Sequence, residues 1–248
     1  MELDAATLAR LAQADPDRVR AAQLAKPDDR AALMVLYAFH AELARIPESV
    51  SQPLIGNMRY QFWRDAVEEI YAGKPPRAHE VVAPLAELIR TRDLPRFWID
   101  RLIDARERDL DPRPFANLDA ARDYSRATSA TLMQLAVRTL GAEDTEQVAG
   151  LGEAWGLAGL ARAFRFYKGS MLQHLDQAGL ASAAMETYAR AKGPISASHV
   201  PAVAYAAFVP LYAKAMSRPG HDAAKGKVEV GSFRKQRRLM RVALSGRV

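Results

Sequence analysis

Three side chains of the kinds that bind metals or transfer protons stand close together in residues 36–50, LYAFHAELARIPESV. They are His40, Glu42 and Glu48. Metal ligands on one helix must be three or four residues apart to share a face, whereas His40 and Glu42 are two apart. Arg45 is three residues from both glutamates, which is the spacing of ion pairs. The spacing therefore favours a charge-paired helix end over a metal site.

Two other acidic clusters allow the same two interpretations. Asp65 lies in an aromatic segment beside Arg64, so it is either a catalytic base or part of a charged helix face, and the face is favoured. In residues 104–111 the acids alternate with Arg106 and Arg108. That alternation favours a self-paired helix end over a divalent-cation site.

Residues 156–170, GLAGLARAFRFYKGS, begin with small side chains and continue with aromatic and basic ones. Gly156 and Gly159 are predicted to let another helix approach closely. Arg162 and Arg165 either contact a phosphate or lie exposed beside the packed helix, and the spacing favours neither.

The charge of the chain, +6 in total, is unevenly distributed. Residues 1–160 hold 20 Lys or Arg and 25 Asp or Glu, a net charge of −5, whereas residues 161–248 hold 15 and 4, a net charge of +11. A basic C-terminal third indicates an anionic neighbour, which could be a membrane surface, a nucleic acid or an acidic protein face.

The most basic segment is 225–248, in which Phe233, Met240 and Leu244 fall on one helical face with Leu239 and Val242 near it. The segment is predicted either to lie on an anionic membrane or a partner, or to cap its own domain with its arginines in solvent. Nucleic acid is not an expected partner, because no nucleic-acid-binding signature is present. The residues predicted to contact a membrane or partner are Arg234, Lys235, Arg237, Arg238 and Arg241.

Composition excludes several kinds of chemistry. The chain has no cysteine, which excludes disulfides, thiolate zinc sites, iron–sulfur ligation and a cysteine nucleophile, and a reducing cytoplasm is the simplest compartment. The sequence has no run of about 18 apolar residues, so no transmembrane helix is expected. The first residues, MELDAATLARLAQADPD, resemble neither a secretion signal nor a transit peptide.

Helical signals dominate the whole chain, and short Pro and Gly breakers separate the segments. They predict one all-α domain over residues 1–248, with 225–248 as a basic C-terminal helix or tail. Ile55, Met58, Phe62 and Ala66 are predicted to form one stripe of the helix at 53–72, with Trp63, Val67 and Ile70 beside it. The expected helices cover residues 28–46, 53–72, 78–92, 96–109, 117–140, 144–168, 172–192, 197–217 and 231–245.

Two long segments resemble the squalene/phytoene synthase family. The first is AALMVLYAFHAELARIPESVSQPLIGNMRYQFWRDAVEEIYAGKPP. The second, RERDLDPRPFANLDAARDYSRATSATLMQLAVRTLG, places Asp109, Tyr124 and Gly141 at family positions and runs on into GLAGLARAFRFY. The resemblance covers about residues 15–170 and implies a single-domain isoprenoid-synthase-like helical bundle with a cavity. The expected cavity or ligand contacts are Phe39, Glu42, Glu48, Arg59, Trp63, Asp65, Asp109, Tyr124, Arg162 and Arg165.

Synthases of this family join two prenyl diphosphates and hold magnesium with two aspartate-rich motifs, because a diphosphate leaving group needs divalent charge neutralisation. Only one of the matching positions here is acidic, so the resemblance implies no catalytic residue, no metal site and no cofactor. Magnesium is expected only if the chain is an enzyme after all. The first motif falls on Ala44, Arg45 and Glu48, and the second on Ala163, Phe166 and Tyr167.

A non-catalytic subgroup of the family shares these losses. The segments AFHAELARIPESVS, IGNMRYQFWRDAVEEIY and LARAFRFYKGS resemble the complex I assembly factor 6 group and its proteobacterial relatives. The resemblance implies a pseudoenzyme that acts in respiratory complex I assembly, with complex I subunits or other assembly factors as partners. It also implies a cytoplasmic protein, peripheral on the inner membrane, or on the matrix side if it is a mature mitochondrial protein.

Two alternatives stay open. A divergent prenyl transferase would need Glu42, Glu48, Asp65 and Asp109 to converge on one cavity. A non-catalytic binder of an isoprenoid or lipid would use Arg59, Arg162 or Arg165 as phosphate contacts.

Overall fold

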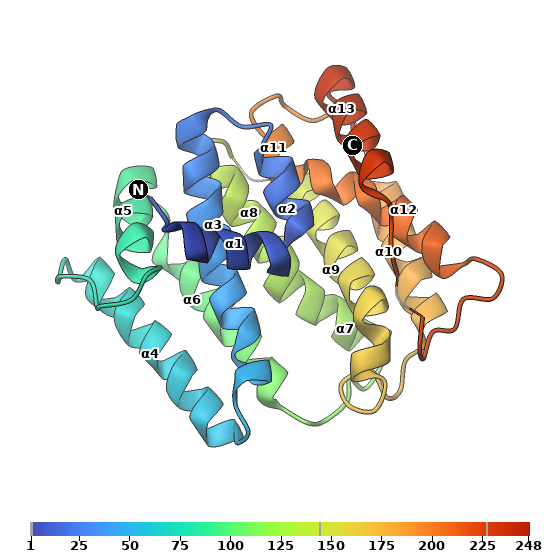
Figure 1. Cartoon of the computed structure of the whole chain (residues 1–248), viewed down its shortest axis with the longest axis horizontal. Coiled ribbons are helices and arrows are strands. Elements are labelled where there is room, and N and C mark those ends of the chain that lie inside the picture. The colour runs from blue at the N-terminus through green and yellow to red at the C-terminus, as the bar shows by residue number, and fades with distance from the viewer. Residues whose placement is uncertain (1, 144, 227) are drawn as a thin grey trace. The chain divides into compact units, whose positions relative to one another are not determined.

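A computed structural model describes residues 2–143, 145–226 and 228–248. The regular structure of these residues is helical, which confirms the predicted all-α class (Figure 1). The described chain divides into two compact units, one of residues 1–111 and 135–143 and the other of residues 112–134 and 144–248. A single domain over residues 1–248 stays a prediction.

The first unit begins with two helices that the sequence analysis did not predict. Asp4 caps the first of them, accepting a hydrogen bond from the Thr7 amide at 2.7 Å. Asp15 caps the second, which has Pro16 at its first position. Both are common helix-start signals. The helices of this unit are α1 (Ala5–Ala14), α2 (Pro16–Ala22), α3 (Pro27–Arg45), α4 (Pro53–Tyr71), α5 (Val82–Arg92) and α6 (Arg96–Glu107).

Helix α3 is the centre of the first unit, as its apolar sequence predicted. Every residue from Ala32 to His40 is buried. The Tyr60 hydroxyl of α4 lies 3.1 Å from the Leu43 carbonyl oxygen of α3 and 2.8 Å from the Arg106 carbonyl oxygen of α6. This one hydroxyl therefore ties three helices together.

The buried face of α4 is only in part the predicted one, since Trp63, Ala66 and Val67 are buried as expected. Ile55 and Met58 are 41% and 66% exposed, so the predicted stripe is wrong at its start. The buried residues follow a rotated face instead: Gly56, Tyr60, Trp63, Ala66 and Val67. Leu110, in the turn that follows α6, packs closely against Gly56. A Cβ at Gly56 would lie 2.6 Å from the Leu110 side chain. The helix after it, α5, begins at Val82 rather than at 78.

The second unit contains α7 (Leu118–Ser125), a π-helical turn (Arg126–Ala130) and the first residues of α8 (Thr131–Thr139), which from residue 135 belongs to the first unit. The predicted helix 117–140 is therefore interrupted. The predicted helix at 144 begins at Glu146, and position 144 lies outside the described residues. The helices that follow are α9 (Glu146–Tyr167), α10 (Gln177–Ala191), α11 (Val200–Val203), α12 (Val209–Met216) and α13 (Ser232–Ser245).

Two more expected helices differ in their bounds. Helix α10 starts at Gln177 rather than 172, because the Asp176 side chain caps it by accepting from the Gly179 amide at 2.7 Å. The expected helix 197–217 is broken by a 3₁₀ segment, Ala204–Phe208, between α11 and α12. None of the helices in the described ranges is both long and apolar enough to cross a bilayer.

Candidate functional site

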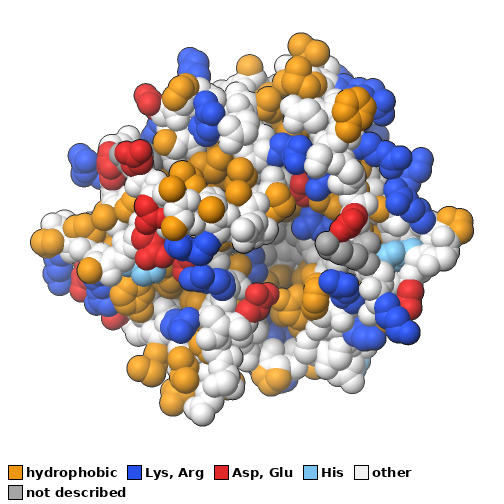
Figure 2. All heavy atoms as spheres, in the orientation of Figure 1, with side chains coloured by type: hydrophobic (Ala, Val, Ile, Leu, Met, Phe, Trp, Pro, Cys, Tyr) orange, Lys and Arg blue, Asp and Glu red, His pale blue; other side chains and the backbone are white. Residues whose placement is uncertain are grey.

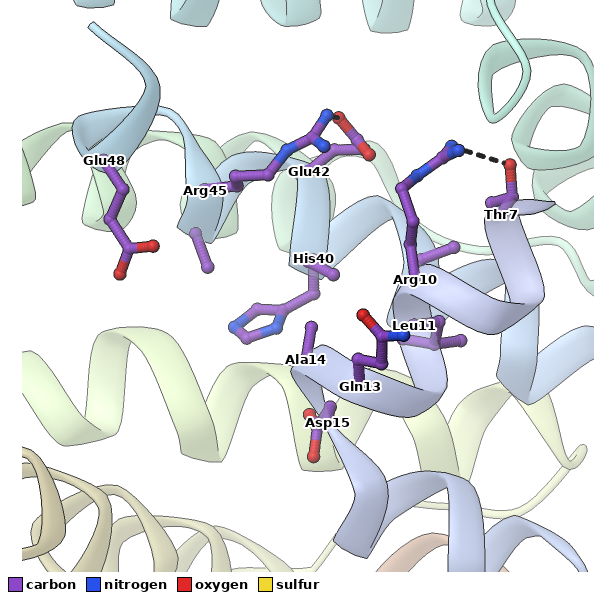
Figure 3. Close-up of a pocket in the computed structure, with 13 residues that line it drawn as sticks. Thr7, Arg10, Leu11, Gln13, Ala14, Asp15, His40, Glu42, Arg45 and Glu48 are labelled. Carbon is purple, nitrogen blue, oxygen red and sulfur yellow. Dashed lines mark hydrogen bonds and ion pairs between the residues drawn. The ribbon is translucent and has the colours of Figure 1, made fainter. Parts of the chain in front are cut away.

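A cavity of about 490 Å³ lies beside the first family motif, between α1 and α3 (Figure 3). We call it the motif cavity. All three residues that align with the first motif, Ala44, Arg45 and Glu48, line this cavity. Its lining residues are Thr7, Arg10, Leu11, Gln13, Ala14, Asp15, Ala38, His40, Ala41, Glu42, Ala44, Arg45 and Glu48.

The arginines of the motif cavity are already in ion pairs. The Arg45 guanidinium lies 2.8 Å from the Glu42 carboxylate, as predicted (Figure 3). Arg10 lies 2.6 Å from Glu80. The predicted pair of Arg45 with Glu48 is wrong, because Glu42 takes the guanidinium and Glu48 lies apart, exposed and with no ion pair among the described residues.

His40 is a buried neutral imidazole. Its side chain is 6% exposed, and its Nε2 lies 2.7 Å from Nη2 of Arg106. A guanidinium can only donate, so Nε2 must accept and the ring proton must sit on Nδ1. Burial, followed by the positive charges of Arg106 and Arg18, lowers the pKa of His40 well below its usual 6.5. His40 is therefore a fixed part of the α3–α6 contact at neutral pH.

The depressed pKa of His40 predicts a loss of stability in acid. The unfolded chain binds a proton at His40 below about pH 6.5 while the folded chain does not, so the free energy of unfolding falls as pH decreases below that value. The limiting slope from this one group is about 1.4 kcal/mol per pH unit. Urea unfolding at about pH 7.5 and 5.5, with His40→Gln as the comparison, measures it.

Glutamine keeps an acceptor for Arg106 but does not titrate, so His40→Gln is expected to have the flatter pH dependence. His199, whose pKa burial also lowers, contributes equally to both proteins and cancels. Equal pH dependence in the two proteins would contradict the neutral, Arg106-bound imidazole.

A second cavity, of about 300 Å³, adjoins the same end of α3. It shares Glu42 and Arg45 with the motif cavity and adds Arg59, Trp63 and His79. Arg59 donates to the Ser49 hydroxyl at 2.7 Å. These two cavities bring together four of the predicted contacts.

Other predicted contacts of the first unit are part of its structure rather than of a cavity. Phe39 is fully buried, with its ring 5.2 Å from that of Trp63. Asp65 lies 3.4 Å from the Arg77 guanidinium, and Asp109 lies 3.0 Å from that of Arg106. Neither aspartate lines either of these two cavities, and each is paired with an arginine instead.

Segment 104–111 is charge-paired, as favoured by its alternation of charge. Arg64 of α4 lies 2.8 Å from Asp104 and 2.6 Å from Glu107. Burial lowers the pKa of Arg64, but the hydrogen bonds that Arg64 donates to these two carboxylates outweigh it and the net pKa is raised. The acids thus serve the contact between α4 and α6.

In the second unit, both predicted arginines lie against aromatic rings. The Arg162 guanidinium is 4.3 Å from the ring centroid of Tyr212 and 4.9 Å from that of Trp155. Arg165 lies 4.4 Å from the Phe166 ring. Such cation–π contacts hold the guanidinium groups against the helix surface.

The remaining predicted contact is Tyr124, whose ring is 5.4 Å from that of Phe115. The residues at the second motif, Ala163, Phe166 and Tyr167, lie in the last turns of α9, and Phe166 is 67% exposed. None of them can ligate a hard cation through a carboxylate.

The motif positions do not fit a magnesium cluster. Magnesium is held by carboxylate oxygens, whereas the motif positions offer Glu48 alone beside a fixed positive charge on Arg45. The other acids of the cavity, Asp15 and Glu42, are paired with Arg18 and Arg45. No group of three or more His, Asp or Glu in residues 2–143, 145–226 and 228–248 is placed to hold a metal. We therefore derive no step through magnesium.

Sequence reasoning missed the groups that complete the site. Arg10 comes from α1, and its only local signal was the Asp4 cap that starts the helix. The contact of His40 with Arg106 joins residues 66 apart, so no local pattern could indicate it. The same holds for Glu153 in the second unit, which accepts from Arg122 at 2.9 Å and from Arg126 at 2.7 Å.

The chain is similar to two groups of known proteins. The squalene/phytoene synthase family profile matches residues 11–167. The bovine protein "NADH dehydrogenase (ubiquinone) complex I, assembly factor 6" is 34% identical over 144 residues, which cover 56% of this chain and 43% of that protein. The human protein of the same name is 33% identical over 144 residues, with the same coverage. The matched stretch thus spans less than half the length of these relatives.

Solved structures show the fold. A dehydrosqualene synthase bound to a ligand superposes with a TM-score of 0.77 at 12% identity, covering 97% of this chain and 95% of that one. The squalene synthase HpnC from Alicyclobacillus acidocaldarius superposes with a TM-score of 0.60 at 17% identity, covering 96% and 92%. The isoprenoid-synthase-like bundle is thereby confirmed. Because the family profile covers most of its length, the chain belongs to the squalene/phytoene synthase family.

Proposed function

We propose that this protein is a non-catalytic member of its family that acts in the assembly of respiratory complex I. One observation carries the proposal: Arg45 occupies the first motif and is paired with Glu42, so a fixed cation stands where the family holds magnesium. The names of its bovine and human relatives support complex I assembly.

The proposed partners are complex I subunits or other assembly factors. The proposed location is cytoplasmic and peripheral on the inner membrane, or on the matrix side in a mitochondrion. The basic C-terminal third, with a net charge of +11 over residues 161–248, supports contact with an anionic surface.

Deleting the gene is expected to reduce assembled complex I and NADH oxidase activity in membranes, measured by native gel and by oxygen consumption. A copy of the intact gene should restore both. Unchanged complex I in the deletion strain would refute the proposed role.

A matched variant separates an assembly role from a catalytic one. Glu48→Gln removes the last acid of the motifs and should restore complex I as well as the intact gene does. Glu48 is exposed and unpaired among the described residues, so this change is expected to alter the free energy of unfolding by less than about 0.5 kcal/mol. Failure of a folded Glu48→Gln protein to restore complex I would favour an enzyme.

The purified protein is expected to release no diphosphate from labelled farnesyl diphosphate in the presence of magnesium. The reason is that one carboxylate beside an arginine does not neutralise the leaving group. An active synthase of the family is the positive control. Magnesium-dependent release that Glu48→Gln abolishes would establish the transferase alternative.

The second cavity supports one other candidate function, the binding of an isoprenoid or lipid without turnover. Its volume of about 300 Å³ and the side chains of Arg59 and Trp63 fit a small amphipathic ligand. Farnesyl diphosphate or a quinone should then raise the Tm of the wild type but not of Arg59→Gln. The absence of a shift at saturating ligand would exclude this candidate.

A further inference from the structure

Helix α13 carries apolar side chains on two different faces. Leu239 and Val242 are 0% and 1% exposed, packed within the second unit. Phe233, Met240 and Leu244 are 80%, 45% and 83% exposed. The sequence analysis placed Leu239 and Val242 near the second group, whereas the structure turns them away from it. Leu239 and Val242 are apolar because they pack the helix onto the second unit. Phe233, Met240 and Leu244, which we call the outer stripe, are not covered by the described residues.

The helix is held firmly on its inner face. The Ile195 amide donates to the Gly246 carbonyl at 2.8 Å, just past the helix end. Arg238 donates to the Ala207 carbonyl at 3.3 Å, and the Lys235 ammonium lies 4.9 Å from the Tyr212 ring centroid. Two of the five predicted membrane contacts therefore anchor the helix, so the outer stripe is presented by a fixed element.

A small cavity of about 110 Å³ lies at the edge of α13. We call it the arginine cavity. No acidic residue of the described ranges pairs with any of its four guanidiniums, whose like charges repel one another. Guanidinium groups bind phosphate oxygens in a fork, and the space can hold a single phosphate group. Its lining residues are Arg234, Arg237, Arg238 and Arg241 with Leu211 of α12.

The arginine cavity and the outer stripe are neighbours on the helix. Arg237 is four residues from Phe233 and from Arg241, and three from Met240, so these side chains share adjoining rows. In Figure 2 Lys and Arg side chains gather beside hydrophobic ones over the region where Figure 1 shows α13. A phosphate in the cavity would thus lie directly beside exposed apolar side chains, which is how a phospholipid arranges its own phosphate and acyl chains.

We infer that α13 is an interfacial helix that docks the second unit on an anionic phospholipid surface, with a headgroup phosphate in the arginine cavity and the outer stripe at the acyl boundary. The inference deepens the membrane contact of the proposed function. The family profile match ends at residue 167, so this site lies outside the residues that the profile matches.

A lipid surface fits this helix better than a protein partner does. Stable protein interfaces bury about 1,200–2,000 Å² and contain a broad apolar centre. The outer stripe is one side chain wide and has arginines along one edge, which instead is the pattern of a helix lying in the headgroup region.

Cosedimentation of the full chain with vesicles tests the inference. The wild type should bind vesicles of phosphatidylcholine mixed with phosphatidylglycerol, bind phosphatidylcholine alone weakly, and lose binding as salt is raised. Arg237→Gln with Arg241→Gln should weaken binding by about 25-fold, since each arginine near an anionic surface contributes about fivefold. Phe233→Ser with Leu244→Ser should weaken it by more than about tenfold.

The control variants remove the same kinds of side chain from surfaces outside α13. Arg90→Gln with Arg218→Gln removes two exposed charges outside α13, and Leu54→Ser with Met58→Ser removes two exposed apolar side chains of α4. Both should bind as the wild type does. In Phe233→Trp, the tryptophan emission should shift to shorter wavelength with anionic vesicles, which reports entry of the outer stripe into the bilayer.

Each other outcome overturns the inference. Absence of vesicle binding would point to an acidic protein partner, and equal weakening by the control variants would remove α13 as the site. A Tm rise with inorganic phosphate that Arg237→Gln with Arg241→Gln abolishes, without vesicle binding, would show a site for free phosphate. The vesicle experiment does not depend on complex I. If the purified protein binds anionic vesicles as expected while the deletion strain has unchanged complex I, only the proposed function is refuted.

Discussion

Replacing Glu153 by alanine is expected to lower the free energy of unfolding by about 3 kcal/mol, because it leaves the buried Arg122 with only a distant counter-charge, the 64% exposed Glu186 at 3.8 Å. The Glu153 side chain is 8% exposed and that of Arg122 is 13% exposed. Their atoms are 2.9 Å apart, and Arg122 also donates to the Thr187 hydroxyl at 2.8 Å. The Arg122 guanidinium therefore joins α7 to Glu153 of α9 and Thr187 of α10.

Arg126 forms the other half of this cluster. Its guanidinium lies 2.7 Å from Glu153, and its side chain is 51% exposed, so it can turn to water when the carboxylate is removed. Most of the expected loss therefore comes from Arg122. Urea unfolding of the two proteins at neutral pH measures the difference.

Two controls make the Glu153 experiment specific. Asp100→Ala breaks the exposed pair with Arg96, which are 38% and 47% exposed, and should cost less than about 0.5 kcal/mol. Glu153→Leu with Arg122→Met removes both charges and should cost less than Glu153→Ala, since no buried charge is left unpaired. A Glu153→Ala protein within about 1 kcal/mol of the wild type would contradict the buried cluster.

Replacing Gly152 by alanine is expected to cost about 3 kcal/mol, because the added methyl group has no room. A Cβ at Gly152 would lie 2.4 Å from the Cα of Ala130 and 3.1 Å from its amide nitrogen. These are backbone atoms, so no side-chain rotation relieves the clash. The helix α9 and the π-helical turn of residues 126–130 would have to separate.

Gly159 of the same helix is the matched control. A Cβ there meets nothing within 4 Å, so Gly159→Ala should raise the free energy of unfolding by about 0.5–1 kcal/mol through reduced backbone entropy in the unfolded chain. Opposite signs for the two alanine substitutions, measured by urea unfolding, are the expected result. The same sign for both would mean that the close approach at Ala130 is not present.

The glycines of α9 also show how far a small-residue pattern can be interpreted. Close packing was predicted at Gly156 and Gly159. It is confirmed at Gly156, where a Cβ would lie 2.7 Å from the Ser125 side chain, and it is wrong at Gly159. Gly152, four residues before Gly156, lies on the same face as Gly156 and completes the contact. The sequence showed that the helix was suited to close approach, but not which face met its neighbour.

The sequence by itself determined the helices and the loss of the metal motifs. Helix caps, helix breakers and the 3.6-residue period act over a few residues, so most helices were placed correctly from the sequence. Asp4 and Asp15 are cap residues of the same kind, and they would have indicated the first two helices as well. The loss of carboxylates at Ala44 and Arg45 could be recognised from the family alignment alone, because neither residue type has a carboxylate.

Only the tertiary structure decided which charges meet and which faces are covered. Arg45 had two glutamates at equal spacing, and the fold selected Glu42. The contact of His40 with Arg106 joins residues distant in sequence, and so does the pair of Arg122 with Glu153. The physical reason is that a helix fixes the directions of its side chains, whereas burial and pairing depend on neighbours brought by distant segments. For the same reason the sequence placed the apolar residues of α13 but did not show which of them are buried and which form the outer stripe.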